Sequence, residues 1–211
     1  PQASWWTGTP PAVLWRSDAG TPPGNALVVT VDATRDQVTQ ATYDAAGRLA
    51  TERVVGVDAS QTQLTTYTYD GAHRLLQVTV SDGAGTAATA RTTRYLYDRA
   101  GRQVAMVDAD GYVTETQYDN AGRVVKTIRY ANISANAAAT DVASLRPATL
   151  DAARDQVTRF FHDGRGQQVG MLDAEGYLTE FVHDEALNQR AVRAYTLRLT
   201  GLGGSESFAT L

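Results

Sequence analysis

Four tyrosine–aspartate pairs recur along the chain, and these two residue types together can transfer protons. A carboxylate can act as a general base and a phenol as a general acid. The pairs are Tyr43-Asp44, Tyr69-Asp70, Tyr97-Asp98 and Tyr118-Asp119. Catalysis requires one preorganised constellation, whereas these pairs follow one another at a nearly regular spacing along the chain. The spacing therefore favours a repeated structural element over a catalytic array.

Each pair opens a six-residue motif that has the composition of a tight turn. The copies read YDAAGR (43–48), YDRAGR (97–102) and YDNAGR (118–123), and the copy YDGAHR (69–74) has His73 in place of glycine. An Asp side chain accepts hydrogen bonds from the local backbone, and a glycine three residues later adopts a positive φ at no steric cost. We therefore expect the motif to form the corner of a β-hairpin. His73 is expected to be a tolerated left-handed residue on the surface.

The motif has two degenerate copies and alternates with a second turn signal. HDGRGQ (162–167) and HDEALN (183–188) carry His162 and His183 in place of the tyrosine. DADGYVTE (108–115) recurs as DAEGYLTE (173–180). The number of residues between these two copies, the long-repeat offset, also separates Asp98 from Asp163 and Asp119 from Asp184. The stretches between the turn signals, such as RVVKTIRY (123–130), are rich in strand-forming residues.

These observations predict an all-β fold of stacked antiparallel β-hairpin repeats, interrupted by a short helical insertion. One unit of about 21 residues buries too little apolar surface to offset its backbone entropy, so each unit needs its neighbours. The residues expected to build the corners have a structural role. They are Tyr43, Asp44, Gly47, Arg48, Tyr69, Asp70, Arg74, Tyr97, Asp98, Gly101, Arg102, Asp108, Gly111, Tyr118, Asp119, Gly122, Arg123, Asp163, Gly166, Asp173, Gly176 and Asp184.

Composition divides the chain into five parts. Residues 1–25 are rich in Pro and Trp and are expected to be extended, and residues 26–132 hold the first repeats. Residues 133–156 are alanine-rich and form the predicted helical insertion. Residues 157–200 hold the degenerate repeats, and residues 201–211 are expected to be a flexible tail.

The overall composition narrows the classes of function. The chain of 211 residues has a formal net charge of −4 and mixes both signs of charge, so a nucleic-acid partner is not expected. It contains no cysteine, which excludes disulfides and thiolate metal sites. No stretch approaches the ~20 apolar residues of a membrane-spanning helix. Because the chain lacks an initiator Met and a secretory signal, we expect it to be a segment of something longer.

The pattern Y-D-x-x-G-R, followed by a strand, a D-x-x-G turn and another strand, resembles the YD repeat of the RHS family over roughly residues 36–195. The resemblance implies a long antiparallel sheet that winds into a hollow spiral shell. Bacterial members include components of insecticidal toxin complexes and polymorphic toxins, whose shells enclose a toxic C-terminal cargo, and the similar teneurins act in adhesion. Some members cleave themselves with aspartates in a distinct core motif, and nothing like that motif occurs in this sequence.

The resemblance implies a structural segment of a large secreted or cell-surface bacterial protein, without enzymatic activity or cofactor. The expected partners are the remainder of a larger RHS polypeptide or toxin complex, with self-association through exposed sheet edges and a glycan as further candidates. One alternative is a glycan- or protein-binding adhesion module, in which Trp5, Trp6 and Trp15 stack on sugars instead of covering the sheet. A second alternative is a carboxylate-based hydrolase.

Three further groups of residues could bind ligands, and each has a simpler structural explanation. Asp108, Asp110, Asp173 and Glu175 could bind Ca²⁺, but the sequence around them lacks the distal ligands of a calcium loop and favours turns. His162 and His183 could share a metal, but we expect them to replace tyrosine in a ladder where each Tyr packs on the next. The row of Arg48, Arg74, Arg102 and Arg123 could bind anions, but the equally periodic aspartates are expected to neutralise it.

Overall fold

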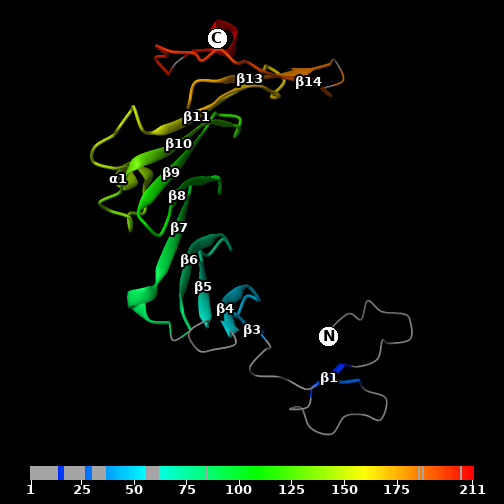
Figure 1. Ribbon diagram of the computed structural model, residues 1–211, viewed down its shortest axis with the longest axis vertical. Helices are drawn as coiled ribbons and strands as arrows, with labels where there is room; N and C mark the ends of the chain where they lie inside the picture. Colours follow the sequence, from blue (N-terminus) through cyan, green and yellow to red (C-terminus); the bar gives the residue numbers. More distant parts are fainter. Residues whose placement is uncertain are drawn as a thin grey trace. The chain divides into compact units, whose positions relative to one another are not determined.

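The computed structural model describes residues 14–16, 27–29, 37–55, 62–83, 85–184, 186, 188–204 and 206–211. Within these residues the regular structure is almost entirely β, as Figure 1 shows. The strands are β1 (Leu14–Arg16), β2 (Leu27–Val29), β3 (Val38–Tyr43), β4 (Leu49–Val55), β5 (Gln63–Tyr69), β6 (Leu75–Asp82), β7 (Arg91–Tyr97), β8 (Gln103–Val107), β9 (Tyr112–Tyr118), β10 (Val124–Ile133), β11 (Gln156–His162), β12 (Gln168–Leu172), β13 (Leu178–His183) and β14 (Gln189–Ala194). The helical turns are η3 (Ala87–Thr89), α1 (Val142–Leu145) and η4 (Phe208–Thr210).

Strands β3 to β14 form one open antiparallel sheet whose spatial order follows the order of the sequence. Strands that are consecutive in the chain are therefore neighbours in the sheet, and the expected all-β fold of antiparallel hairpins is confirmed. Strands β1 and β2 pair separately and in parallel, with Leu14 opposite Leu27. Apart from β1, the Pro/Trp-rich residues 1–25 lie outside the described residues.

The chain divides into two compact units, and the boundary between them passes through β5 and β6. The first unit comprises residues 1–65 and 80–90. Within it β3 pairs with β4, with Val38 opposite Val55. Gly83 lies so close to Thr62 that a Cβ at Gly83 would be 2.1 Å from the threonine Cγ2. A side chain at position 83 would therefore separate the two residues.

The second unit comprises residues 66–79 and 91–211, and its strands keep a regular register with one repeated irregularity. Val107 lies opposite Val113, and Leu172 opposite Leu178, so residues related by the long-repeat offset make equivalent pairs. The ladder shifts immediately before a motif tyrosine or histidine, as it does at Tyr97. The same shift precedes Tyr43, His162 and His183. The irregularity therefore belongs to the motif.

The best-buried core lies where the insertion between β10 and β11 covers one face of β8, β9 and β10. The buried residues of this core are Ala105, Val107, Val113, Ile128, Tyr130 and Leu145. Leu145 belongs to α1, the single helical turn of the insertion, and its side chain is fully buried. Burying a leucine contributes about 1.5–3 kcal/mol. Asp141 caps α1 by accepting a hydrogen bond from the Ser144 amide at 2.9 Å.

The segment after β14 repeats the path of the chain after β10. The Ser134 amide donates to the Gly111 carbonyl at 2.9 Å, and the Leu199 amide donates to the Gly176 carbonyl at 2.9 Å. The long-repeat offset relates both members of the second pair to those of the first. The tail then reaches η4, where Phe208 packs on Phe161 with ring centroids 6.0 Å apart. Residues expected to be flexible thus lie against β11 and β12 in the second unit.

No helix among the residues that the structure describes is long and apolar enough to cross a membrane.

Candidate functional site

The repeated hexamer forms a tight turn that the aspartate closes with both its backbone and its side chain. At Asp98 the backbone amide donates to the Arg102 carbonyl at 2.9 Å, and the Asp98 carbonyl accepts from Gly101 at 3.0 Å. The Oδ1 atom of Asp98 accepts from the amides of Ala100 and Arg102, both at 2.9 Å. Gly101 has a φ of 83°, which an L side chain adopts only with strain.

The same turn geometry occurs throughout the repeats. A hydrogen bond from the residue three positions later to the aspartate carbonyl is present at Asp44, Asp70, Asp98, Asp108, Asp119, Asp163 and Asp173. His73 closes its turn in the glycine position with a φ of 64°. Asp184, in the most degenerate copy, accepts from the amide of Asn188 at 2.8 Å, as the other aspartates do from the equivalent residue, and from Arg190 Nε at 2.7 Å.

The motif arginine binds the aspartate of its own turn through two guanidinium nitrogens. Arg102 places Nε 2.7 Å and Nη2 2.6 Å from Asp98 Oδ2. Hydrogen bonds from the backbone and side chain of Arg102 lower the pKa of Asp98, although partial desolvation opposes them. Equivalent ion pairs join Arg48 to Asp44, Arg74 to Asp70 and Arg123 to Asp119. The arginine row is thus paired, residue by residue, with aspartates.

The motif arginine also reaches forward to the next turn. The Arg74 guanidinium lies over the Tyr97 ring at 4.8 Å, and that of Arg102 lies over Tyr118 at 4.6 Å. Arg74 Nη1 donates to the Asp98 carbonyl at 3.3 Å, and Arg123 donates equivalently to Asp163 at 3.2 Å. Cation–π contacts of this kind contribute about 0.5–1 kcal/mol at exposed sites. These arginines therefore join one hexamer turn to the next hexamer turn along the chain.

Tyr97 and Tyr118 pack on arginines and not on each other, contrary to the expected ladder of rings. A ring-to-ring contact joins Phe161 and Phe208, whereas Tyr97 and Tyr118 lie on arginines. Tyr97 donates its hydroxyl to the Leu75 carbonyl and Tyr118 donates to the Gln103 carbonyl, both at 2.9 Å. Tyr97 and Tyr118 therefore contact the arginine and the strand of the preceding hexamer instead of another tyrosine.

The histidines that replace tyrosine are the least satisfied polar groups of the repeats. The Nδ1 atoms of His162 and His183 are buried and have no hydrogen-bond partner among the described residues. The two residues stand on β11 and β13, with β12 between them. Among the residues that the structure describes, no cluster of three or more His, Cys, Asp or Glu could hold a metal ion.

The acidic residues of the second turn signal act locally. Asp108 Oδ1 accepts from the amides of Asp110 and Tyr112, at 3.0 and 2.9 Å. Asp173 Oδ1 accepts equivalently from Glu175 and Tyr177. Asp110 instead forms an exposed ion pair with Arg91 at 2.9 Å. In both turns the first aspartate binds its own backbone, as in the hexamer.

A buried charged network was not found from the sequence. Glu115 is 3% exposed, and Arg146 donates to it from Nε at 2.8 Å and from Nη2 at 2.7 Å. Tyr130 and Gln117 donate to the same carboxylate at 2.7 and 2.8 Å. Burial raises the pKa of Glu115, but these donors outweigh it and lower the pKa from 4.5 to about 2. Burial and Glu115 together raise the pKa of Tyr130 to about 12.

The network left one signal in the sequence. The long-repeat offset that relates Glu115 to Glu180 also relates Tyr130 to Tyr195. Tyr195 indeed donates to Glu180 Oε2 at 2.8 Å. A paired recurrence of Glu and Tyr at one offset therefore indicated a contact that recurs within the chain.

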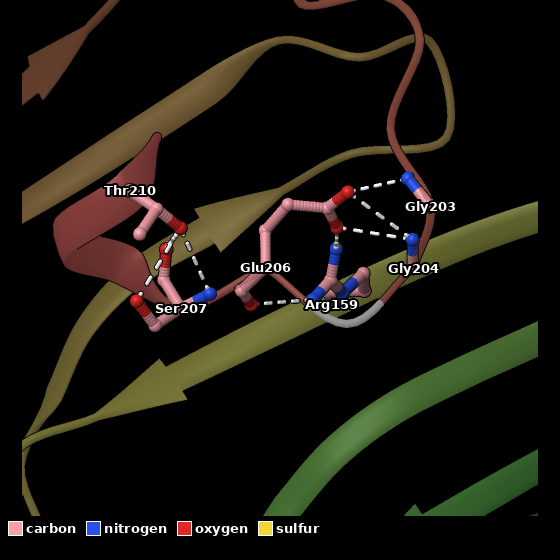
Figure 2. Close-up of polar contacts among 6 residues, drawn as sticks. All are labelled: Arg159, Gly203, Gly204, Glu206, Ser207 and Thr210. Atoms are coloured by element: carbon pink, nitrogen blue, oxygen red, sulfur yellow. Dashed lines mark hydrogen bonds and ion pairs between the residues drawn. The ribbon is translucent and has the colours of Figure 1, made fainter.

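A second ion pair fastens the tail, as Figure 2 shows. Arg159 on β11 donates from Nη1 to Glu206 Oε2 at 2.5 Å and from Nη2 to the Glu206 carbonyl at 2.6 Å. The Glu206 carboxylate also accepts from the amides of Gly203 and Gly204. The glycine-rich loop thus surrounds a carboxylate of its own chain.

The tryptophans proposed as sugar-stacking residues cannot be placed at the site. Trp5 and Trp6 lie outside the described residues, as does the side chain of Trp15.

Known proteins resemble this chain in the segments that form the hexamer turns. The RHS repeat family matches residues 43–87 and 97–132. No curated protein is significantly similar to the chain in sequence. Solved structures titled TcdB2-TccC3 without hypervariable C-terminal region, TcdB2-TccC3-TEV and TcdB2-TccC3-Cdc42 are 18%, 19% and 18% identical, each with a TM-score of 0.52. The matches cover 74%, 74% and 78% of this chain, and 8% of each of those chains.

The likeness to these structures shows a shared β fold, and the chain spans less than a tenth of their length. The matched segments contain the four complete or near-complete hexamers, whose turns and arginine contacts are described above. These two segments of the chain are thus similar to the RHS repeat, and they are the segments in which the turns and the arginine contacts recur.

Proposed function

We propose that the chain is a wall segment of a larger RHS-type β-shell in an exported bacterial toxin protein, where it encloses or presents a cargo. The family match and the toxin-complex neighbours support this role. The chain covers 8% of those neighbours, a proportion that suits one part of a long wall. Its partners in this proposal are the remainder of the RHS polypeptide and the toxin complex that the polypeptide joins.

The observation that carries the proposal is that the repeated aspartates and arginines make their contacts within and between the turns. In the described turns the motif aspartate accepts hydrogen bonds from its own backbone, and the arginine is shared between its own turn and the next. A carboxylate-based hydrolase would instead need two acidic groups converging in one pocket with separated pKa values. The repeated polar groups support a scaffold, because their hydrogen-bonding capacity is used in the turns.

Limited proteolysis of the full polypeptide that carries this segment tests the proposal. Replacing Arg102 and Arg123 with alanine removes two links between turns, and it should increase the rate at which protease degrades the cargo. Replacing Arg99, an exposed residue of the same turn as Arg102, is the matched control and should leave the rate unchanged. If circular dichroism shows that the wall has loosened while the cargo remains equally protected, the proposed enclosure is wrong.

Export can be tested separately. Fractionation of bacteria that express the full polypeptide should recover it outside the cytoplasm or at the cell surface. Retention of all the protein in the cytoplasm under conditions where the complex assembles would contradict the proposed location.

A further inference from the structure

Glu115 and Glu180 occupy equivalent positions in two repeats of the second unit, and each accepts a hydrogen bond from an equivalent tyrosine. Glu115 lies opposite Ala105, and Glu180 lies opposite Gly170, so both pairs follow the long-repeat offset. Tyr130 donates to Glu115 Oε2 at 2.7 Å, and Tyr195 donates to Glu180 Oε2 at 2.8 Å. Beyond this shared hydrogen bond the two carboxylates differ.

The Glu115 carboxylate is saturated, whereas half of the Glu180 carboxylate is open. Arg146 binds both oxygens of Glu115, and the Glu115 side chain is 4% exposed. Glu180 receives Tyr195 and Arg193 on Oε2 only, and its side chain is 21% exposed. Its Oε1 atom has no hydrogen-bond partner within the described part of the chain. Val182 stands where Gln117 donates to Glu115, so it adds no donor.

A cavity of about 300 Å³ lies beside Glu180. Its polar lining comes from Glu180 and Tyr195, and its apolar walls include Leu178, Leu197 and Leu199. A cavity of this size with apolar walls and one or two polar groups has the character of a small binding pocket. The apolar walls suit an alkyl chain, and the carboxylate suits a cationic group at the end of that chain.

The repeat itself indicates which cation fits. Leu211, which also lines the cavity, lies as far beyond Leu199 in the sequence as Arg146 lies beyond Ser134. Ser134 and Leu199 make the equivalent backbone hydrogen bond described above, so Leu211 corresponds in position to Arg146 of the preceding repeat. A guanidinium carries several N–H donors on a planar group, so one of them can donate to the open Oε1 atom of Glu180 although Oε2 is already occupied.

We propose that this cavity binds the arginine side chain of another polypeptide segment, with the guanidinium on Glu180 and the methylene groups against Leu178, Leu197 and Leu199. The second unit thereby carries a docking site that the preceding repeat fills with its own Arg146. This inference goes beyond the proposed scaffold role and does not depend on it, because it rests on two carboxylates of one unit.

Nuclear magnetic resonance titration of the ¹⁵N-labelled chain tests the site. The probe is a peptide with the sequence of residues 142–147, VASLRP, acetylated and amidated at its ends. We expect saturable shifts of the amides of residues 178–180 and 195–199. The Glu180→Gln chain and a peptide in which glutamine replaces arginine should each bind at least fivefold more weakly. Equal binding by either control, or no saturable shift with the parent peptide, overturns the proposal.

An intramolecular experiment keeps the proposal testable if the peptide aggregates. Leu211→Arg supplies a guanidinium at the position equivalent to Arg146, and it should raise the Tm by about 2 °C or more. The same substitution in the Glu180→Gln background should give no increase. An equal increase in both backgrounds would show that the arginine acts elsewhere and would refute the assignment of the cavity.

Discussion

The pKa of Glu115 makes stability depend on pH in a direction that can be worked out from the structure. Its pKa is lowered from 4.5 to about 2 by Arg146, Gln117 and Tyr130, which together overcome burial. A carboxyl with a lowered folded-state pKa stabilises the fold above its unfolded pKa, near 4.5. That contribution is lost as the pH falls toward 2. The second unit should therefore lose stability below about pH 5 through this one group.

The magnitude follows from the two pKa values. At about 1.36 kcal/mol for each tenfold change in proton affinity, the shift from 4.5 to about 2 stabilises the fold by about 3 kcal/mol at about pH 6. Because the Arg146 side chain is 42% exposed, solvent screening makes this an upper value. About 2 kcal/mol of it should disappear between pH 6 and pH 3.

Urea unfolding of the parent chain and of Glu115→Gln, followed by far-ultraviolet circular dichroism, measures this effect. Glutamine keeps the size of the side chain but does not ionise, so the difference in unfolding free energy should shrink by about 2 kcal/mol from pH 6 to pH 3. Glu180→Gln is the matched control. The Glu180 carboxylate is more exposed than that of Glu115, so the effect of its removal on the unfolding free energy should change less with pH. A difference that stays constant over this range would refute the reasoning.

Three further predictions concern the turns and the tail. Gly166→Ala should cost about 1 kcal/mol because φ is 88° there, whereas Gly164→Ala in the same turn meets no atom within 4 Å and should cost nothing; thermal denaturation distinguishes them. Arg102→Lys should lower stability by about 0.5–1 kcal/mol by weakening the contact with Tyr118, while Arg99→Lys should have no effect in the same denaturation assay. Gly170→Ala should displace Phe208, because two ring atoms lie 2.5 Å from the position that the added Cβ would take, and it should cost about 1–3 kcal/mol of unfolding free energy. Faster hydrogen exchange of the amides in residues 206–211 would reveal the displacement, and Phe208→Ala should relieve the clash.

Local chemistry made the strands and their corners predictable. Asp98 and Gly101 are three residues apart, and this spacing alone specifies an aspartate-closed turn with a glycine at positive φ. The strand-forming residues between such turns can only pair with their neighbours, which yields hairpins in sequential order. The all-β fold therefore followed from information contained within each unit of the sequence.

Contacts that depend on the spacing of units in space were not predictable in the same way. Tyr118, for example, packs on Arg102 of the preceding corner and not on another tyrosine. Arg146, the ion-pair partner of Glu115, lies 31 residues away in the insertion. Similarly, Arg159 and Glu206 are 47 residues apart, so no local pattern links them.

The forward reach of the motif arginine gives the repeat a direction. Arg74 and Arg102 each brace the corner that comes later in the chain, through Tyr97 and Tyr118. Each of these corners is thus in contact with the arginine of the corner before it, and its own arginine contacts the corner after it. Loss of one arginine should therefore weaken two corners at once, its own and the one that follows, because their shared contact stabilises both.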